Sequence, residues 1–226
     1  MPLNTAVVGG RSKSFVHDVD ARWLMAYAAG LGDFGPAYTA TEARSVLGHP
    51  VFPVCLEWPA ILDCANITGA QSASAEERTR GVHAAHDLHI HRPIRAGERL
   101  TTQATVVGLE QIKPGAAQTT RLDTYDTDGE LVSQTYQLGI TRGVEVIGNP
   151  APVAERPELP RLVSPHKADL RFEISVSAQA AHIYTECARI WNPIHTDRAV
   201  ALAAGLPDII LHGTATMALA VSKIVE

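Results

Sequence analysis

Two histidines near the end of the sequence are the residues best suited to chemistry. His195 closes an Asn-Pro-Ile-His stretch that begins at Asn192, and His212 stands directly before Gly213. An imidazole titrates near neutral pH, so either histidine can accept or donate a proton. Gly213 opens an alanine-rich segment, and the N-terminus of a helix favours negative charge. These residue types are compatible with acid–base chemistry beside the start of a helix, and a turn residue with a satisfied hydrogen bond is the alternative for His195.

Helix signals surround both histidines. Asp197 is an expected cap for a helix over residues 198–204, and a second helix is expected from Gly213 to Val225. Before them, Ser177 is the expected cap of a helix that ends near Arg189. The two histidines should therefore lie in turns between helices.

The segment around these helices repeats an earlier part of the chain. Each copy reads as a strand, a helix and a proline turn, and in the first copy we expect Asp20 to cap the helix. We expect the tyrosine of each copy to pack against the sheet. A chance likeness of two amphipathic helices is the alternative. An offset of 157 residues aligns Phe15 with Phe172, Val19 with Val176, Ala21 with Ala178, Tyr27 with Tyr184, and Pro36 with Pro193.

Between the two copies the sequence predicts an antiparallel meander. Threonine, valine, leucine and tyrosine are frequent in the expected strands, and Pro-Gly and Asp-Gly pairs mark turns between them. A helix within Pro53 to Asn66 should be wrapped by this sheet. The second copy ends after its helices, with no segment to match the meander. The expected strands are residues 82–91, 100–107, 117–125 and 131–141.

A proline-rich segment separates the two copies. Residues 148–165 contain five prolines, which cannot continue a helix or an interior strand. We therefore expect an N-terminal domain over residues 1–147, an extended linker over 148–165 and a C-terminal domain over 166–226.

Composition excludes several classes of protein. The chain has 226 residues, 46% of them hydrophobic, which is typical of a globular protein. Its net charge of −5 argues against binding to nucleic acid, and no apolar run is long enough for a membrane span. Three cysteines in apolar surroundings indicate free thiols and a cytoplasmic location. We expect no metal site, and interpret the strand histidines as solvated: His83, His86, His89 and His91.

The C-terminal part resembles the MaoC-like (R)-specific enoyl-CoA hydratase/dehydratase family, in its double hot-dog form. The resemblance rests on the Asn-Pro-Ile-His stretch, on Gly-Leu-Pro at residues 205–207 and on Leu-His-Gly ending at Gly213. The first part resembles the degenerate N-terminal repeat of such proteins, through residues 83–93 and 113–116. The resemblance implies an α+β fold in which a long central helix is wrapped by antiparallel sheet, with the second repeat incomplete at its C-terminus.

The resemblance also implies a reaction. An acyl-CoA hydratase or dehydratase adds water to a 2-enoyl-CoA thioester or removes it from a 3-hydroxyacyl-CoA, with no cofactor because coenzyme A is part of the substrate. His195 would be catalytic, and Asn192 would orient the water or the imidazole. The N–H of Gly213 would bind the thioester oxygen. His212 and Arg189 are further candidates for substrate contact, although a structural role for His212 and a solvated helix-end charge at Arg189 are the alternatives.

The sequence departs from the family motif at its acidic position. Ile190 stands where the motif has aspartate, and Arg189 where it has glycine. Glu186, one helical turn earlier, is one candidate replacement, and Asp33 of the first copy is another. A third hypothesis is that the site binds an acyl-CoA without hydrating it, as a partner subunit. A thioesterase that uses Glu186 or Asp33 is a further alternative on the same fold.

The second copy lacks strands that would match the meander, and this predicts how the protein assembles. The helix from Gly213 to Val225 would expose part of its apolar face, and the sheet would end in an unpaired edge. We expect that the chain is a fragment of a longer polypeptide, or that a neighbouring subunit completes the second repeat in a homodimer or heteromer.

Overall fold

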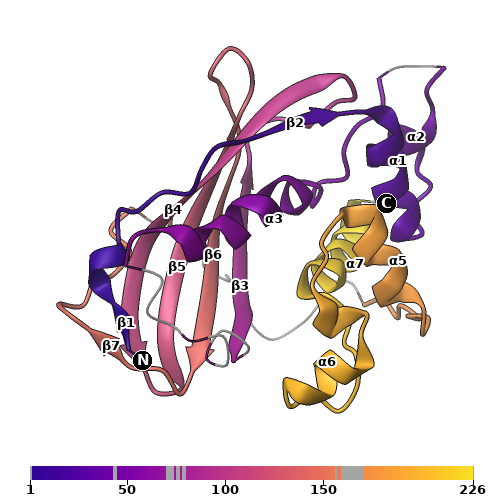
Figure 1. Cartoon of the computed structure of the whole chain (residues 1–226). Helices are drawn as coiled ribbons and strands as arrows, with labels where there is room; N and C mark the ends of the chain where they lie inside the picture. The colour runs from indigo at the N-terminus through magenta and orange to yellow at the C-terminus, as the bar shows by residue number, and fades with distance from the viewer. Residues whose placement is uncertain are drawn as a thin grey trace.

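The computed structural model is built on a five-stranded antiparallel sheet (Figure 1). It describes residues 2–42, 45–69, 74, 77, 80–155, 157–158 and 171–225. The strand order is β2-β4-β5-β6-β3, so β2 and β3 are the two edges. A separate pair of short parallel strands joins the start of the chain to the end of the first half. The strands are β1 (Leu3–Asn4), β2 (Phe15–Val19), β3 (Gly81–Ile90), β4 (Glu98–Ile112), β5 (Gly115–Tyr125), β6 (Leu131–Arg142) and β7 (Val146–Ile147).

One apolar helix, α3 (Pro53–Asp63), lies across a face of this sheet (Figure 1). Pro53 stands in its first turn, where the missing N–H costs no intrahelical bond, and Pro59 lies inside the helix. Leu56 and Ala60 are fully buried. A helix packed inside a curved antiparallel sheet is the hot-dog arrangement, so the expected α+β class is confirmed.

The long strand β4 runs further than the pattern predicted. Its pairing with β5 shifts register between Val106 and Gly108, which marks a bulge. A side chain at position 108 would meet Val153 Cγ2 at 2.7 Å, so the chain that follows β7 passes close to the bulge. The strand continues beyond Gly108 because glycine admits this close approach.

The remaining helices gather beyond one end of the sheet (Figure 1). Asp20 accepts a hydrogen bond from the N–H of Trp23 at 2.7 Å, and Asp197 caps a later helix in the same way, as expected. In the described residues no helix is long and apolar enough to cross a membrane. The helices are η1 (Thr5–Val7), α1 (Ala21–Gly30), α2 (Pro36–Thr39), η2 (Cys64–Asn66), α5 (Ala180–Ala188), η4 (Pro193–His195), α6 (Arg198–Ala203) and α7 (Gly213–Val225).

The two halves meet through a pair of equivalent tyrosines. Helices α1 and α5 pack together, and the hydroxyl groups of Tyr27 and Tyr184 lie 3.2 Å apart in a buried contact. Both side chains belong to the core cluster that also contains Leu100 and Val132 of the sheet. The two residues that the 157-residue offset aligns are thus in contact with each other.

Two further expectations for the second copy are wrong. Helix α5 begins at Ala180 after Gln179, and Ser177 contributes only its carbonyl to the first turn. The segment Phe172–Val176 forms no strand, because it has no neighbouring strand with which to share backbone hydrogen bonds in the described chain. Phe172 and Val176 are consequently half exposed. The boundaries of the proposed domains stay a prediction, and residues 159–170 lie outside the described part.

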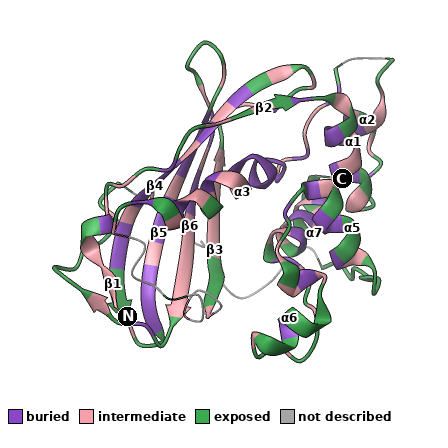
Figure 2. Ribbon diagram, in the orientation of Figure 1, coloured by how far each residue is buried: buried purple, intermediate pink, exposed green. Residues whose placement is uncertain are grey.

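The core divides into two clusters. One lies between α3 and the sheet, and includes Ala60, Leu109 and Leu122. The other joins both halves of the chain, because Leu24 and Phe52 pack with residues of α5 and α7. Figure 2 shows these inner faces as buried and α6 as largely exposed. Along α7 four apolar side chains are incompletely covered, as expected: Met217, Leu219, Val221 and Ile224.

Candidate active site

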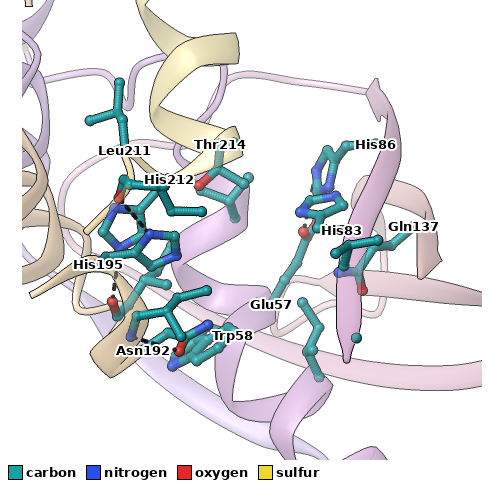
Figure 3. Close-up of a pocket in the computed structure, with 18 of the residues that line it drawn as sticks. Glu57, Trp58, His83, His86, Gln137, Asn192, His195, Leu211, His212 and Thr214 are labelled. Atoms are coloured by element: carbon teal, nitrogen blue, oxygen red, sulfur yellow. Dashed lines mark hydrogen bonds and ion pairs between the residues drawn. The ribbon is translucent and has the colours of Figure 1, made fainter. Parts of the chain in front are cut away.

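A cavity of about 420 Å³ lies between the two halves of the chain (Figure 3). One wall comes from α3 and β3, and the facing wall comes from the turns after α5 and the start of α7. Apolar side chains of both halves cover much of its surface. Among the lining residues are Val54, Glu57, Trp58, Ile61, His83, His86, Gln137, Arg142, Ile190, Asn192, Ile194, His195, Leu211, His212, Gly213 and Thr214.

His195 is held at the cavity by a short 3-10 turn. The side chain of Asn192 caps this turn, with its Oδ1 accepting a hydrogen bond from the N–H of Ile194 at 3.4 Å. His195 Nδ1 lies 2.8 Å from the carbonyl oxygen of Ile210. A carbonyl only accepts, so Nδ1 carries the proton and Nε2 keeps a free lone pair. Burial lowers the pKa of His195, so the neutral, basic form dominates at pH 7.

His212 stacks on His195. The two ring centroids are 3.6 Å apart, and His212 is almost fully buried. Its Nε2 lies 3.3 Å from the carbonyl oxygen of Ile190 and 3.2 Å from Thr185 Oγ1, which indicates an Nε2–H donor. Burial, and then the neighbouring His195, lower the pKa of His212 to about 4. His212 therefore stays neutral, and its ring packs against one face of the His195 imidazole.

Gly213 lies on the cavity wall as the first residue of α7. The first N–H groups of an α-helix have no partner within the helix, and the helix dipole makes this end positive. A side chain added at position 213 would meet nothing within 4 Å, so the packing of the chain does not itself require glycine here. The close approach of a ligand to this end of the helix would explain why the residue at position 213 has no Cβ.

Glu57 is a carboxyl group that the motifs did not indicate. It projects from α3 into the cavity, is 1% exposed, and its Oε1 accepts a hydrogen bond from Thr135 Oγ1 at 2.5 Å. Burial raises the pKa of Glu57 to about 7, so a large share of the group is protonated at neutral pH. The available signal was an acid in the middle of an apolar stretch, where an unpaired carboxyl group is costly; the other acid of α3, Asp63, is its last residue.

The strand histidines are not all solvated, contrary to expectation. The side chain of His86 is only 6% exposed, and its Nε2 lies 3.5 Å from Glu57 Oε2. Burial lowers the pKa of His86 to about 3. His83 lies beside it, with ring centroids 5.2 Å apart. Within the described residues, no group of three or more histidine, cysteine, aspartate or glutamate side chains is placed to hold a metal ion.

The structure brings together four of the seven residues singled out from the sequence. Asn192, His195, His212 and Gly213 all line the cavity. Glu186, the candidate replacement for the motif carboxylate, is exposed on α5 and is not one of the lining residues. Its catalytic role stays a prediction that no contact in the described chain supports.

Arg189 and Asp33 lie away from the lining residues. Arg189 has a left-handed φ of 57° at the end of α5, the conformation for which glycine is best suited. Its guanidinium lies 3.9 Å from the centre of the Trp23 ring, so arginine is held there by a cation–π contact with the first half. Asp33 is buried, and its Oδ1 accepts a hydrogen bond from the N–H of Gly35 at 3.1 Å.

A hot-dog layer, a pair of neutral histidines and a helix N-terminus on one cavity define a protein of the hydratase and dehydratase class. The family models agree. The model described as FAS1-like, dehydratase domain region matches residues 6–135, and the model described as MaoC like domain matches residues 162–226. The chain therefore belongs to the MaoC-like and FAS1-like dehydratase family, whose members are enzymes of the hydro-lyase kind.

Individual relatives are distant. A UPF0336 protein from Streptomyces coelicolor is 26% identical over 148 residues, which cover 64% of this chain and 99% of that protein. A MaoC-like dehydratase from Phytophthora capsici superposes with a TM-score of 0.78 at 20% identity, covering 96% of this chain and 75% of that one. The full-length peroxisomal multifunctional enzyme type 2 from Drosophila melanogaster gives a TM-score of 0.71 at 21% identity, covering 95% and 37%. At these identities the two structures support the fold.

Proposed function

We propose that the protein catalyses the reversible addition of water to a 2-enoyl-CoA thioester. The observation that carries the proposal is the hydrogen bond from His195 Nδ1 to the carbonyl oxygen of Ile210 at 2.8 Å. It leaves the basic Nε2 of a neutral imidazole on a cavity whose wall also includes the N-terminus of α7. A base and an oxyanion donor on one cavity are what hydration beside a thioester requires.

The reaction balances with His195 as the single proton carrier. Nε2 takes a proton from water while the water oxygen bonds to C3 of the enoyl group. The thioester oxygen gains negative charge and accepts a hydrogen bond from the N–H of Gly213. The imidazolium then returns the proton to C2, and the thioester carbonyl forms again. The free amide nitrogen of Asn192 is available to orient the water.

A test compares hydration and hydrolysis of crotonyl-CoA in one assay. His195→Ala should lower the hydration rate by roughly 10²- to 10⁴-fold, the usual cost of losing a positioned acid–base group. For the parent, kcat/KM should fall as the pH drops through a pKa below 6.5, because protonation removes the base. His91→Ala, a change at an exposed histidine, is the matched control.

The outcome also separates the alternatives. Release of free coenzyme A without loss of the enoyl group would assign a thioesterase. Binding of crotonyl-CoA without either reaction would assign an acyl-CoA-binding subunit, the alternative that Ile190 favours. Hydration that survives His195→Ala within a few-fold would place the active site elsewhere.

The assembly of the protein remains a proposal as well. Strand β3 pairs only with β6 in the described chain, so its outer edge is open to another strand. We infer that a second repeat, from a continued polypeptide or from another subunit, pairs with this edge.

A further inference from the structure

A buried carboxyl–imidazole pair on the cavity wall has no part in the proposed proton transfer. Glu57 Oε2 and both ring nitrogens of His86 are buried, and none has a hydrogen-bond partner in the described chain. They come from α3 and β3, the first half of the molecule. Figure 3 shows them across the cavity from His195 and His212. Buried polar groups are normally paired, so this wall is built to meet a polar ligand atom.

The chemistry of the pair defines that atom. Thr135 Oγ1 donates to Glu57 Oε1, so a protonated Glu57 carries its hydrogen on Oε2. His86 is neutral, and in the tautomer with its hydrogen on Nδ1 it offers a lone pair on Nε2, which lies 3.5 Å from Oε2. The wall therefore presents one donor and one acceptor side by side. An alcohol group uses both at once, because a hydroxyl accepts one hydrogen bond and donates another.

The position of the pair indicates which part of a thioester reaches it. A cavity of about 420 Å³ cannot hold the nucleotide of coenzyme A, which must remain outside. The pair is among the most buried polar groups of the wall, with Glu57 1% exposed. Apolar side chains of Val54, Trp58 and Ile61 line the same wall. This is the environment of an acyl chain that ends in, or carries, a polar group.

We propose that Glu57 and His86 bind a hydroxyl group on the acyl chain of the substrate, beyond the reacting carbons. The inference rests on the proposed hydration of an enoyl thioester. It makes the protein selective for hydroxylated acyl chains over plain alkyl chains. A carboxylate in the same place would meet a partly ionised Glu57 and be repelled.

The competing role for Glu57 is that of a second acid–base group, in place of the carboxylate missing at position 190. Two observations favour the anchor. The carboxyl group faces Thr135 and His86, on the wall opposite His195. The imidazole of His195 can also carry the proton in both directions by itself.

The experiment uses two thioesters of equal chain length, hex-2-enoyl-CoA and 6-hydroxyhex-2-enoyl-CoA. The parent should hydrate the hydroxylated substrate with a kcat/KM about tenfold higher, since a site built for a hydroxyl discriminates against a chain that leaves its polar groups unpaired. Glu57→Leu should abolish or reverse that ratio. Glu57→Gln should keep most of it, because an amide still donates and accepts. Glu110→Leu and Glu110→Gln, at an exposed position of β4, are the matched controls.

Each result decides between the roles. Equal parent rates on the two thioesters, with no change of ratio in Glu57→Leu, would overturn the anchor. A large, equal loss of kcat on both substrates in Glu57→Gln would also overturn it, and would assign Glu57 to proton transfer. If the parent hydrates neither thioester, the proposed function fails instead. Calorimetric binding of hexanoyl-CoA and 6-hydroxyhexanoyl-CoA then tests the anchor alone, with equal affinities counting against it. Circular dichroism checks that each variant is folded.

Discussion

Ile190 gives the cavity an apolar wall where the family motif has an acid. Its side chain is 5% exposed, and its carbonyl oxygen receives the N–H of His212. The residue is therefore tied to the same histidine pair that the motif carboxylate would serve. At position 190 this chain therefore has no side chain that could act as a base beside His195.

Restoring the acid should raise the rate of hydration. We expect Ile190→Asp to hydrate crotonyl-CoA faster than the parent, because a carboxylate beside His195 can share the task of activating water. The variant should unfold more readily, by about 1–3 kcal/mol, since a polar group enters a packed apolar site. Initial rates and urea unfolding measure the two effects.

Ile190→Asn is the matched control for that prediction. It has the shape and polarity of the aspartate but cannot take up a proton. If both variants hydrate at the same rate, then a carboxylate at position 190 is not what the cavity lacks.

At the scale of elements, a buried hydrogen bond between side chains joins the last helix to the first half. His49 Nδ1 accepts from the N–H of Val51 at 3.1 Å, so its Nε2 carries the proton and donates to Ser222 Oγ, also at 3.1 Å. His49 and Ser222 are both buried. Helix α7, which places Gly213 on the cavity, is therefore positioned in part by a residue of the first half.

Removing this hydrogen bond should loosen α7. Ser222→Ala leaves the N–H of His49 buried and unpaired, which should lower the free energy of unfolding by roughly 1–3 kcal/mol. Thr216→Ala, at an exposed position of the same helix, should change it by no more than about 0.5 kcal/mol. Urea denaturation of the three proteins checks the difference, and equal midpoints would mean that the bond does not hold the helix.

At the scale of the whole molecule, buried neutral histidines tie stability to pH. Burial lowers the pKa of His49 and of His212 to about 4, and that of His86 to about 3. In the unfolded chain each histidine titrates near its ordinary value of about 6.5. Below that pH the unfolded state binds more protons, so the free energy of unfolding should fall as the pH drops towards 4. Glu57 acts in the opposite direction, because its raised pKa makes the folded state the better proton acceptor between pH 4.5 and about 7.

The three histidines with the lowest pKa values outweigh one glutamate in this balance, and the lowered pKa of His195 acts in the same direction. Between pH 7 and pH 5 we expect a net loss of about 3 kcal/mol in the free energy of unfolding. Urea midpoints at the two pH values measure it, and His49→Gln should show a smaller loss. Stability that is unchanged or greater at pH 5 would contradict the burial of these imidazoles.

Signals from residues close together in the sequence were enough to predict the four long strands, two of the helices and the cavity wall that holds His195 and Gly213. Strand-favouring residue types and turn pairs located the four long strands, and short polar caps located helices α1 and α6, because these features depend on neighbours in the chain. The Asn-Pro-Ile-His and His-Gly motifs located His195 and Gly213 for the same reason. Helix α5 was placed too early, since Ser177 can cap in principle but Gln179 precedes the first helical residue in the fold.

Contacts between distant segments were decided only by the tertiary structure. Glu57 and His86 lie on different elements, and only the packing of α3 across the sheet brings them together and removes them from water. Tyr27 and Tyr184 repeat at a recognisable offset, yet nothing in the repeat shows that their hydroxyl groups meet. The sequence by itself determined which groups can carry protons and which helix end can hold an oxyanion. Burial depends on neighbours far along the chain, so only the fold decided that the opposite wall of the cavity is a carboxyl group with a raised pKa beside a neutral imidazole.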